Sequence, residues 1–178
     1  MLKFKHILVG FGISLSCSAA LAEGAYLASG LARVGGKETG YEYNSTNFIA
    51  LIGYEFSENI AIEGETSFIL ADDTVSILGQ SIDVGLTHTA VFLKGSVEVS
   101  EDVSIFARLG QSKGKAEAKV GGVGVTVDDT AFSYGFGIEF HEVLDSMNVR
   151  LDYSTAEYKA NGSTTDGTVM ALTTVFRF

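Results

Sequence analysis

Cysteine, proline and tryptophan are almost missing from this chain of 178 residues, which has one cysteine, no proline and no tryptophan. Basic residues are also scarce: 12 Lys and Arg stand against 22 Asp and Glu, for a net charge of −10. An acidic chain argues against nucleic-acid binding, which relies on clustered positive charge. The three histidines do not have metal-ligand spacing, so the sequence predicts no metal site and no cofactor.

The single cysteine, Cys17, lies in an amino-terminal segment with the plan of a secretory signal peptide. Residues 1–22 start with two lysines, continue with an apolar stretch and end on the small-residue site Ala20-Leu21-Ala22. Cleavage after Ala22 would leave 156 residues with a net charge of −12 and no cysteine, which excludes disulfides. A lipoprotein signal at Cys17 is the alternative, but the leucine expected three residues before the cysteine is missing.

Long hydrophobic runs are absent after this segment, since none approaches the roughly 18 apolar residues of a membrane-spanning helix. Residues 168–178 instead alternate, with Met170, Leu172 and Phe176 in one set and Arg177 in the other. Eleven alternating residues are enough for one tilted strand to cross a bilayer. A chain that crosses lipid without helices must form a closed barrel, because lipid offers no partner for its backbone groups.

Alternation and polar turns together predict eight strands, over 25–34, 47–56, 60–70, 87–99, 103–112, 130–140, 147–157 and 168–178. Short polar turns (57–59, 100–102 and 141–146) alternate with longer connections (35–46, 71–86, 113–129 and 158–167). This regularity predicts an all-β fold, an eight-stranded antiparallel up-and-down transmembrane β-barrel over residues 23–178. Alternation within the long connections also predicts that several are hairpins continuing the barrel strands; mobile glycine-rich loops are the alternative.

One alternate set of most strands is apolar, and the other carries the charges, so the two sets must face different surroundings. We expect the apolar sets to face lipid and the charged sets to face the barrel interior; the faces of 25–34 stay unassigned. A soluble barrel around an apolar ligand would need the reverse. Outward aromatics near the strand ends predict two interfacial belts, although tryptophan, which is usual there, is missing: Tyr54, Phe56, Phe140, Phe176 and Phe178 at one end, and Phe48, Phe68, Phe132 and Tyr153 at the other.

The predicted interior charges are six acids and four bases. An eight-stranded barrel holds little more than its own side chains, so these groups should pair into a network. A narrow ion path or gate is the functional alternative to such a structural core. The residues are Glu55, Glu63, Glu65, Glu98, Glu139 and Asp152, with Lys94, Arg108, Arg150 and Arg177.

Catalytic constellations are scarce. Beyond the leader only His88 and His141 remain, in different strand regions, and no His-x-Ser occurs. Some barrels of this size modify lipid A with a His–Ser–acid set, so the sequence predicts no enzyme of that class. The pairs Asp72-Asp73 and Asp128-Asp129 could bind divalent cations or bridge to lipopolysaccharide, but we favour solvated loop carboxylates.

Several segments resemble the eight-stranded outer-membrane barrels of the OmpA transmembrane-domain, OmpX/Ail and opacity-protein type. They are Ile52-Gly-Tyr-Glu-Phe-Ser-Glu-Asn-Ile-Ala-Ile-Glu-Gly-Glu65, Ala107-Arg-Leu-Gly110, Tyr134-Gly-Phe-Gly-Ile-Glu139, Val149-Arg-Leu-Asp-Tyr153 and Phe176-Arg-Phe178. The resemblance spans essentially the whole chain after the leader. It implies export to the bacterial outer membrane, contact with its lipid and lipopolysaccharide, and an assembly signal in Phe176 and Phe178 that the barrel-assembly machinery reads.

The role that follows is a non-enzymatic outer-membrane protein with a structural or surface-interaction function, in adhesion or envelope integrity, through extracellular loops. A ligand bound by those loops is the expected external partner. A small passive porin-like channel is the alternative, and lipid A modification is a third hypothesis. Alternation and aromatic belts recur in barrels of different roles, so they specify the architecture rather than the function.

Overall fold

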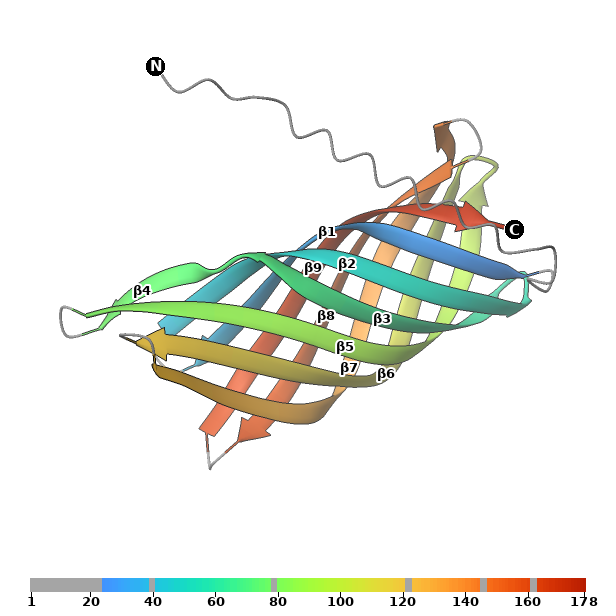
Figure 1. Ribbon diagram of the computed structural model, residues 1–178. Coiled ribbons are helices and arrows are strands. Elements are labelled where there is room, and N and C mark those ends of the chain that lie inside the picture. Colours follow the sequence, from blue (N-terminus) through green and yellow to red (C-terminus); the bar gives the residue numbers. More distant parts are fainter. Residues whose placement is uncertain (1–23, 39–40, 78–79, 121–122, 145–146, 161–162) are drawn as a thin grey trace, which may run out of the picture.

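A computed structural model describes residues 24–38, 41–77, 80–120, 123–144, 147–160 and 163–178, almost all of them in strands (Figure 1). The predicted signal peptide, with Cys17, Ala20 and Ala22, lies outside the described residues. The strands are β1 (Ala25–Glu38), β2 (Tyr41–Ser57), β3 (Ile60–Ala71), β4 (Asp73–Ile77), β5 (Gln80–Ser100), β6 (Val103–Val120), β7 (Val123–Leu144), β8 (Met147–Ala160) and β9 (Ser163–Arg177). Within these ranges, no helix has the length and apolar character needed to cross a membrane.

Eight of these strands close into one antiparallel barrel. They hydrogen-bond in the order β3-β2-β1-β9-β8-β7-β6-β5, and a ladder between β3 and β5 joins the two ends of the row. β1 pairs with β9, so the first and last strands are neighbours. β4 continues from β3 and forms a hairpin with the beginning of β5. The predicted eight-stranded up-and-down barrel is therefore confirmed.

Three strands are about twice as long as a bilayer requires. β5, β6 and β7 have 21, 18 and 22 residues, whereas a tilted strand crosses lipid in about 9–11. The β6–β7 ladder runs unbroken from Val103↔Phe140 to Val120↔Val123. The β4–β5 and β6–β7 hairpins extend at the left of Figure 1, and β9 ends at the other end of the barrel. The hairpin prediction is confirmed, and the predicted strand limits are too short because pairing follows the alternation beyond the lipid.

The predicted turn over 141–146 is wrong in its extent. β7 continues to Leu144, which pairs with Met147 after an irregularity that follows Phe140. Within it Glu142 has a left-handed φ of 52°, and its N–H donates to Oδ1 of Asn148 at 3.0 Å. A bulge of this kind bends the strand without ending it, because the unpaired residue takes up the change of direction.

The apolar sets face outward and the charged sets face inward, as predicted. In β3, Ile62 and Phe68 are 43% and 55% exposed, whereas Glu63 and Glu65 between them are 0% and 4% exposed. Similar exposed apolar side chains continue around the barrel, a surface far larger than soluble monomers show. This belt suits lipid and excludes the soluble barrel with an apolar interior.

The first strand, whose faces the sequence left open, lines the interior with small and apolar side chains. Tyr26, Ala28, Ala32 and Val34 are at most 5% exposed, whereas Leu31 is 55% exposed on the outside. β9 also faces the interior with small apolar side chains, those of Val169, Ala171 and Val175. The interior therefore has a largely apolar wall at β1 and β9, and apart from Arg177 at the end of β9 the interior charges come from the other strands.

Candidate functional site

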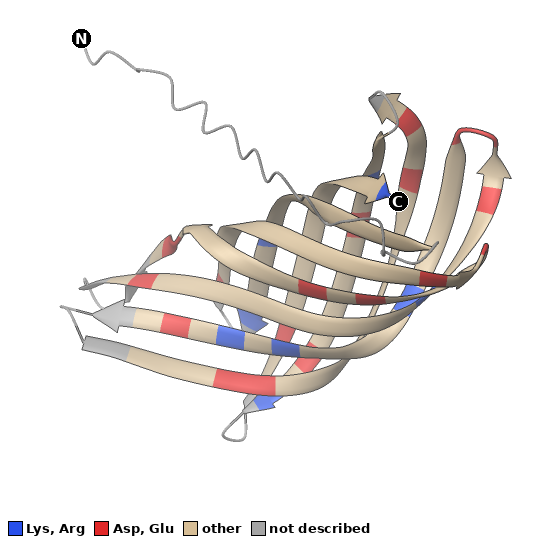
Figure 2. Cartoon of the chain, turned by 45° about the vertical axis from the view of Figure 1, so that its right-hand side comes forward, with Lys and Arg blue, Asp and Glu red and all other residues tan. Residues whose placement is uncertain are grey.

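Two arginines with no exposed surface occupy the middle of the barrel interior. Arg108 of β6 donates to Glu65 Oε2 and to Asp152 Oδ1, both at 2.6 Å. Arg150 of β8 donates from Nε to Asp152 Oδ2 at 3.1 Å. Asp152 thus joins the two guanidinium groups. Figure 2 shows that acidic and basic positions lie on neighbouring strands rather than in one patch.

Glu63 is the centre of this network. It accepts two hydrogen bonds from Arg150, at 2.6 and 3.1 Å, and a third from the Tyr26 hydroxyl at 2.5 Å. Lys94 Nζ and Arg108 Nη1 lie 3.5 and 3.7 Å from its carboxylate. A buried carboxylate persists only when cations and hydrogen bonds compensate for its lost hydration, and Glu63 has both.

Aromatic rings fill the space beside the two guanidinium groups. The Phe92 ring lies 4.3 Å from Arg108 Cζ, and the Phe106 ring lies 4.2 Å from Arg150 Cζ. Phe92 and Phe106 are 1% and 5% exposed. Since the charged groups and the rings are all shielded from solvent, the interior is closed at this height.

A second group of charged side chains lies nearer the short turns and is more exposed to solvent. Arg177 donates to Glu139 at 2.6 Å and to Glu55 at 3.2 Å, and Asn148 also donates to Glu139, at 2.7 Å. The side chain of Arg177 is 37% exposed. Glu98 departs from the prediction: it is exposed and forms no ion pair within the described part of the chain. It belongs to the inward set, but it lies only two residues before β5 ends, where the interior opens to solvent.

The backbone ladder between β3 and β5 ends at Thr66↔Thr89, well before the long hairpins begin. Beyond that point, side-chain hydrogen bonds close the barrel wall. Ser45 Oγ and Asn47 Nδ2 of β2 donate to the carbonyl of Leu86, at 3.1 and 2.7 Å. Ser67 Oγ of β3 accepts from the backbone N–H of His88 at 2.9 Å. These hydrogen bonds hold β5 against β2 and β3 where no β3–β5 ladder is present.

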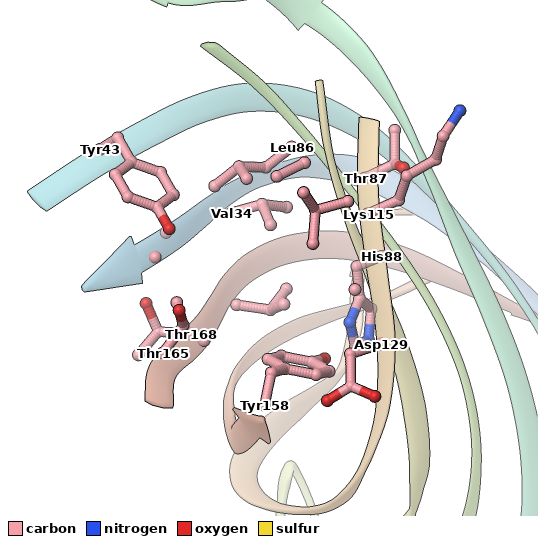
Figure 3. A pocket seen from close by; sticks show the side chains of 17 residues that line it. Val34, Tyr43, Leu86, Thr87, His88, Lys115, Asp129, Tyr158, Thr165 and Thr168 are labelled. Atoms are coloured by element: carbon pink, nitrogen blue, oxygen red, sulfur yellow. The ribbon is translucent and has the colours of Figure 1, made fainter. Parts of the chain in front are cut away.

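A cavity of about 350 Å³ lies above the network, at the hairpin end (Figure 3). Tyr43, Val34 and Leu86 line one side in this view, and Tyr158 and His88 lie opposite. His88 Nε2 is 2.8 Å from Glu65 Oε1, so the cavity meets the network at this residue.

Tyr158 reaches across the interior from β8 to β6. Its hydroxyl is 2.8 Å from Ser112 Oγ, and burial raises the pKa of the phenol above its usual value. A Cβ at Gly167 would lie 2.4 Å from the ring, and one at Gly114 would lie 2.9 Å away. Glycine at both positions therefore makes room for the ring.

Sequence reasoning missed Tyr26 and His88 as members of the network. Tyr26 lies in the strand whose two alternate sets of residues are similar in polarity. Its ring lies against Gly53, where a Cβ would come within 2.1 Å of the ring, so it fits only because this position is glycine. His88 was considered only as a catalytic residue. The available signal was the alternation within 87–99, because His88 shares the inward set of that strand with Phe92 and Lys94.

The remaining candidates have ordinary surroundings. Asp128 pairs with Lys113, and Asp129 and Asp73 accept backbone N–H groups. In the described ranges no three His, Cys, Asp or Glu residues gather as a metal site would require. Phe176 and Phe178 are 41% and 55% exposed on the outer surface.

Comparisons with known proteins agree with this architecture. The family described as outer membrane protein beta-barrel domain matches residues 7–178. The Ail attachment invasion locus protein of Yersinia pestis is 21% identical, with 86% of this chain and 99% of that chain covered and a TM-score of 0.58. One of its structures is a complex with the heparin analogue sucrose octasulfate.

Two further solved structures share the fold. Neisserial surface protein A is 12% identical, with 88% and 98% of the two chains covered and a TM-score of 0.69. OprG from Pseudomonas aeruginosa is 10% identical, with 88% and 97% covered and a TM-score of 0.57. Among curated proteins no sequence matches. At these identities the likeness extends to the fold alone.

Proposed function

The chain belongs to the outer membrane protein β-barrel domain family, and we propose that it is a non-enzymatic surface protein that acts through its long hairpins. The family indicates the bacterial outer membrane as its location. Short turns of such barrels face the periplasm and long connections face outward, so the β4–β5 and β6–β7 hairpins would project from the cell. Adhesion and support of the envelope are the roles that such hairpins and a stable barrel serve.

The strand lengths carry this proposal. About half of β5, β6 and β7 exceeds what lipid requires, and the excess remains paired rather than looping freely. Paired hairpins present their side chains in fixed positions, so little conformational entropy is lost when a partner binds. A barrel with no role outside the membrane would not need strands that extend beyond the lipid.

The closed interior supports a surface role over a passive channel. Arg108, Arg150 and Glu63 are 0% exposed, which argues against a water-filled path past these described residues. The channel alternative would require these ion pairs to separate together. Each separation would leave a buried charge uncompensated, at a cost of about 3–5 kcal/mol.

The charge of the hairpins argues against a polyanionic partner. The connecting segments 35–46, 71–86, 113–129 and 158–167 contain five lysines and nine acids, so they are net negative. A sulfated ligand such as that of the Ail complex needs a positive surface. We therefore expect a neutral or basic partner. The lysines are Lys37, Lys113, Lys115, Lys119 and Lys159; the acids are Glu38, Glu42, Asp72, Asp73, Asp83, Glu117, Asp128, Asp129 and Asp166.

Export and assembly complete the proposal. Residues 1–22 would direct secretion and be removed after Ala22. Phe176 and Phe178 would be read by the barrel-assembly machinery as β9 closes against β1. The exposed apolar belt would then contact membrane lipid, including lipopolysaccharide in the outer leaflet.

Shortened hairpins test the surface role. Asn-Gly turns replace residues 74–83 and 118–125, so that the Asp73↔Val84 and Glu117↔Thr126 pairs still close the shortened hairpins. Cells that display this variant should lose retention on wells coated with extracellular matrix, while the barrel still shows heat-modifiable gel mobility. A control of unchanged length, with Gly and Ser throughout the same segments, separates side-chain chemistry from reach. Full retention by the shortened protein would contradict the proposal.

A further inference from the structure

The cavity at the hairpin end has the size and lining of a small-molecule site. Its volume of about 350 Å³ falls in the range of ligand pockets, about 300–1,000 Å³. It is partly open toward the hairpins, and the ion-pair network closes it below. Val34, Leu86 and Val169 form its apolar wall, and each of them is only 3–6% exposed.

One polar atom inside this cavity lacks a partner. His88 is 4% exposed, and its Nε2 lies 2.8 Å from the Glu65 carboxylate, which can only accept. In the neutral imidazole tautomer that donates from Nε2 to Glu65, Nδ1 presents a lone pair. Within the described residues Nδ1 forms no hydrogen bond, although His88 lines the cavity. A nearly buried acceptor of this kind favours a ligand that donates a hydrogen bond.

The charges around the cavity do not favour an ion. Lys115 and Asp129 both line it, one of each sign, and both already have partners. Lys115 pairs with Glu117, and Asp129 accepts the backbone N–H of Lys159 at 2.6 Å. An anion or a cation would leave its hydration shell without a counter-charge in return.

We propose that this cavity binds a compact, uncharged molecule with an apolar body and one hydrogen-bond donor, which His88 Nδ1 accepts. The body lies against Val34, Leu86 and Val169, with Tyr158 facing them. This activity goes beyond the surface role of the hairpins, and it requires no macromolecular partner. The hairpin segments replaced above, 74–83 and 118–125, do not line the cavity, so the two proposals fail independently.

Indole is a suitable probe, because it has this shape and one N–H, and because the protein has no tryptophan to obscure its fluorescence. The full chain, folded in lipid nanodiscs, should bind indole saturably and shift its emission to shorter wavelength. 1-Methylindole has the same body without the donor. It should bind about three- to tenfold more weakly, the value of one net hydrogen bond.

Two variants assign the site. His88→Phe should abolish the preference for indole over 1-methylindole, and heat-modifiable gel mobility checks that the variant is folded. Ala116→Phe fills the cavity and should abolish saturable binding of both probes. Ala107→Phe, the same change on the outer face of β6, should bind like the wild type. Equal affinity of the wild type for both probes, or full indole binding by Ala116→Phe, would overturn the proposal.

Discussion

Glu63→Gln should lower the free energy of unfolding by about 3–5 kcal/mol, the typical cost of removing one partner from a buried ion pair. The substitution keeps the shape of the side chain and removes only its charge. Arg150, which donates to both carboxylate oxygens at 2.6 and 3.1 Å, would lose its main counter-ion. Lys94, at 3.5 Å, would lose the carboxylate nearest to it. Because Glu63 is 0% exposed, water cannot replace the lost charge.

Equilibrium unfolding in urea, with the barrel in lipid vesicles, measures this loss. Without tryptophan, the signals are far-UV circular dichroism and heat-modifiable gel mobility. Glu55→Gln is the matched control, since its pair with Arg177 is partly exposed and such pairs contribute less than about 1 kcal/mol. Glu63→Gln combined with Arg150→Met should recover part of the loss, because it removes both charges. Equal losses in Glu63→Gln and Glu55→Gln would refute a dry, closed interior.

Three further predictions concern the termini and the hairpins. Phe178→Ala should reduce the amount of inserted barrel, whereas Phe68→Ala, at an equal exposure of 55%, should not; heat-modifiable mobility of membrane fractions measures both, and equal amounts would count against an assembly signal. Asn47→Leu should weaken the attachment of β5 by about 1–3 kcal/mol, the penalty for a lost buried hydrogen bond, and speed proteolysis of the β4–β5 hairpin; an unchanged rate would contradict this. Lys113 holds the pKa of Asp128 below its usual range. This ion pair therefore stabilises the β6–β7 hairpin at pH values above the usual pKa of Asp, and the stabilisation is lost as the pH falls through the lowered pKa. The protection factors of the hairpin amides, which correct for the pH dependence of intrinsic exchange, should therefore stay constant from pH ~7 to ~5 and fall below about 4, and Lys113→Gln should remove that fall.

The architecture was predictable because period-2 alternation directly reports which side chains share a face. Glu63 and Glu65 alternate with Ile62 and Phe68, and a one-residue slip would place both carboxylates in lipid. The same logic failed for β1, where Tyr26 belongs to a set that is otherwise small. Whether the Tyr26 side chain points inward depends on the space left by Gly53 in the next strand, and this tertiary contact is not visible in the sequence of β1 alone.

The site was predictable only in its composition. Which acid pairs with which base depends on register across several strands, and Asp152 joins two arginines that the sequence cannot order. The cavity was not predictable, because it depends on how far β5 and β6 continue as a hairpin and on the reach of Tyr158 to Ser112. Such contacts join residues 46 positions apart, and no local pattern reports them.

The claim that the interior is closed is tested most directly by single-channel recording of the wild-type barrel in planar lipid bilayers. With Arg108, Arg150 and Glu63 fully buried, we predict a silent membrane over the voltages at which porins conduct. Discrete, reproducible openings that change in Arg108→Ala would contradict the account.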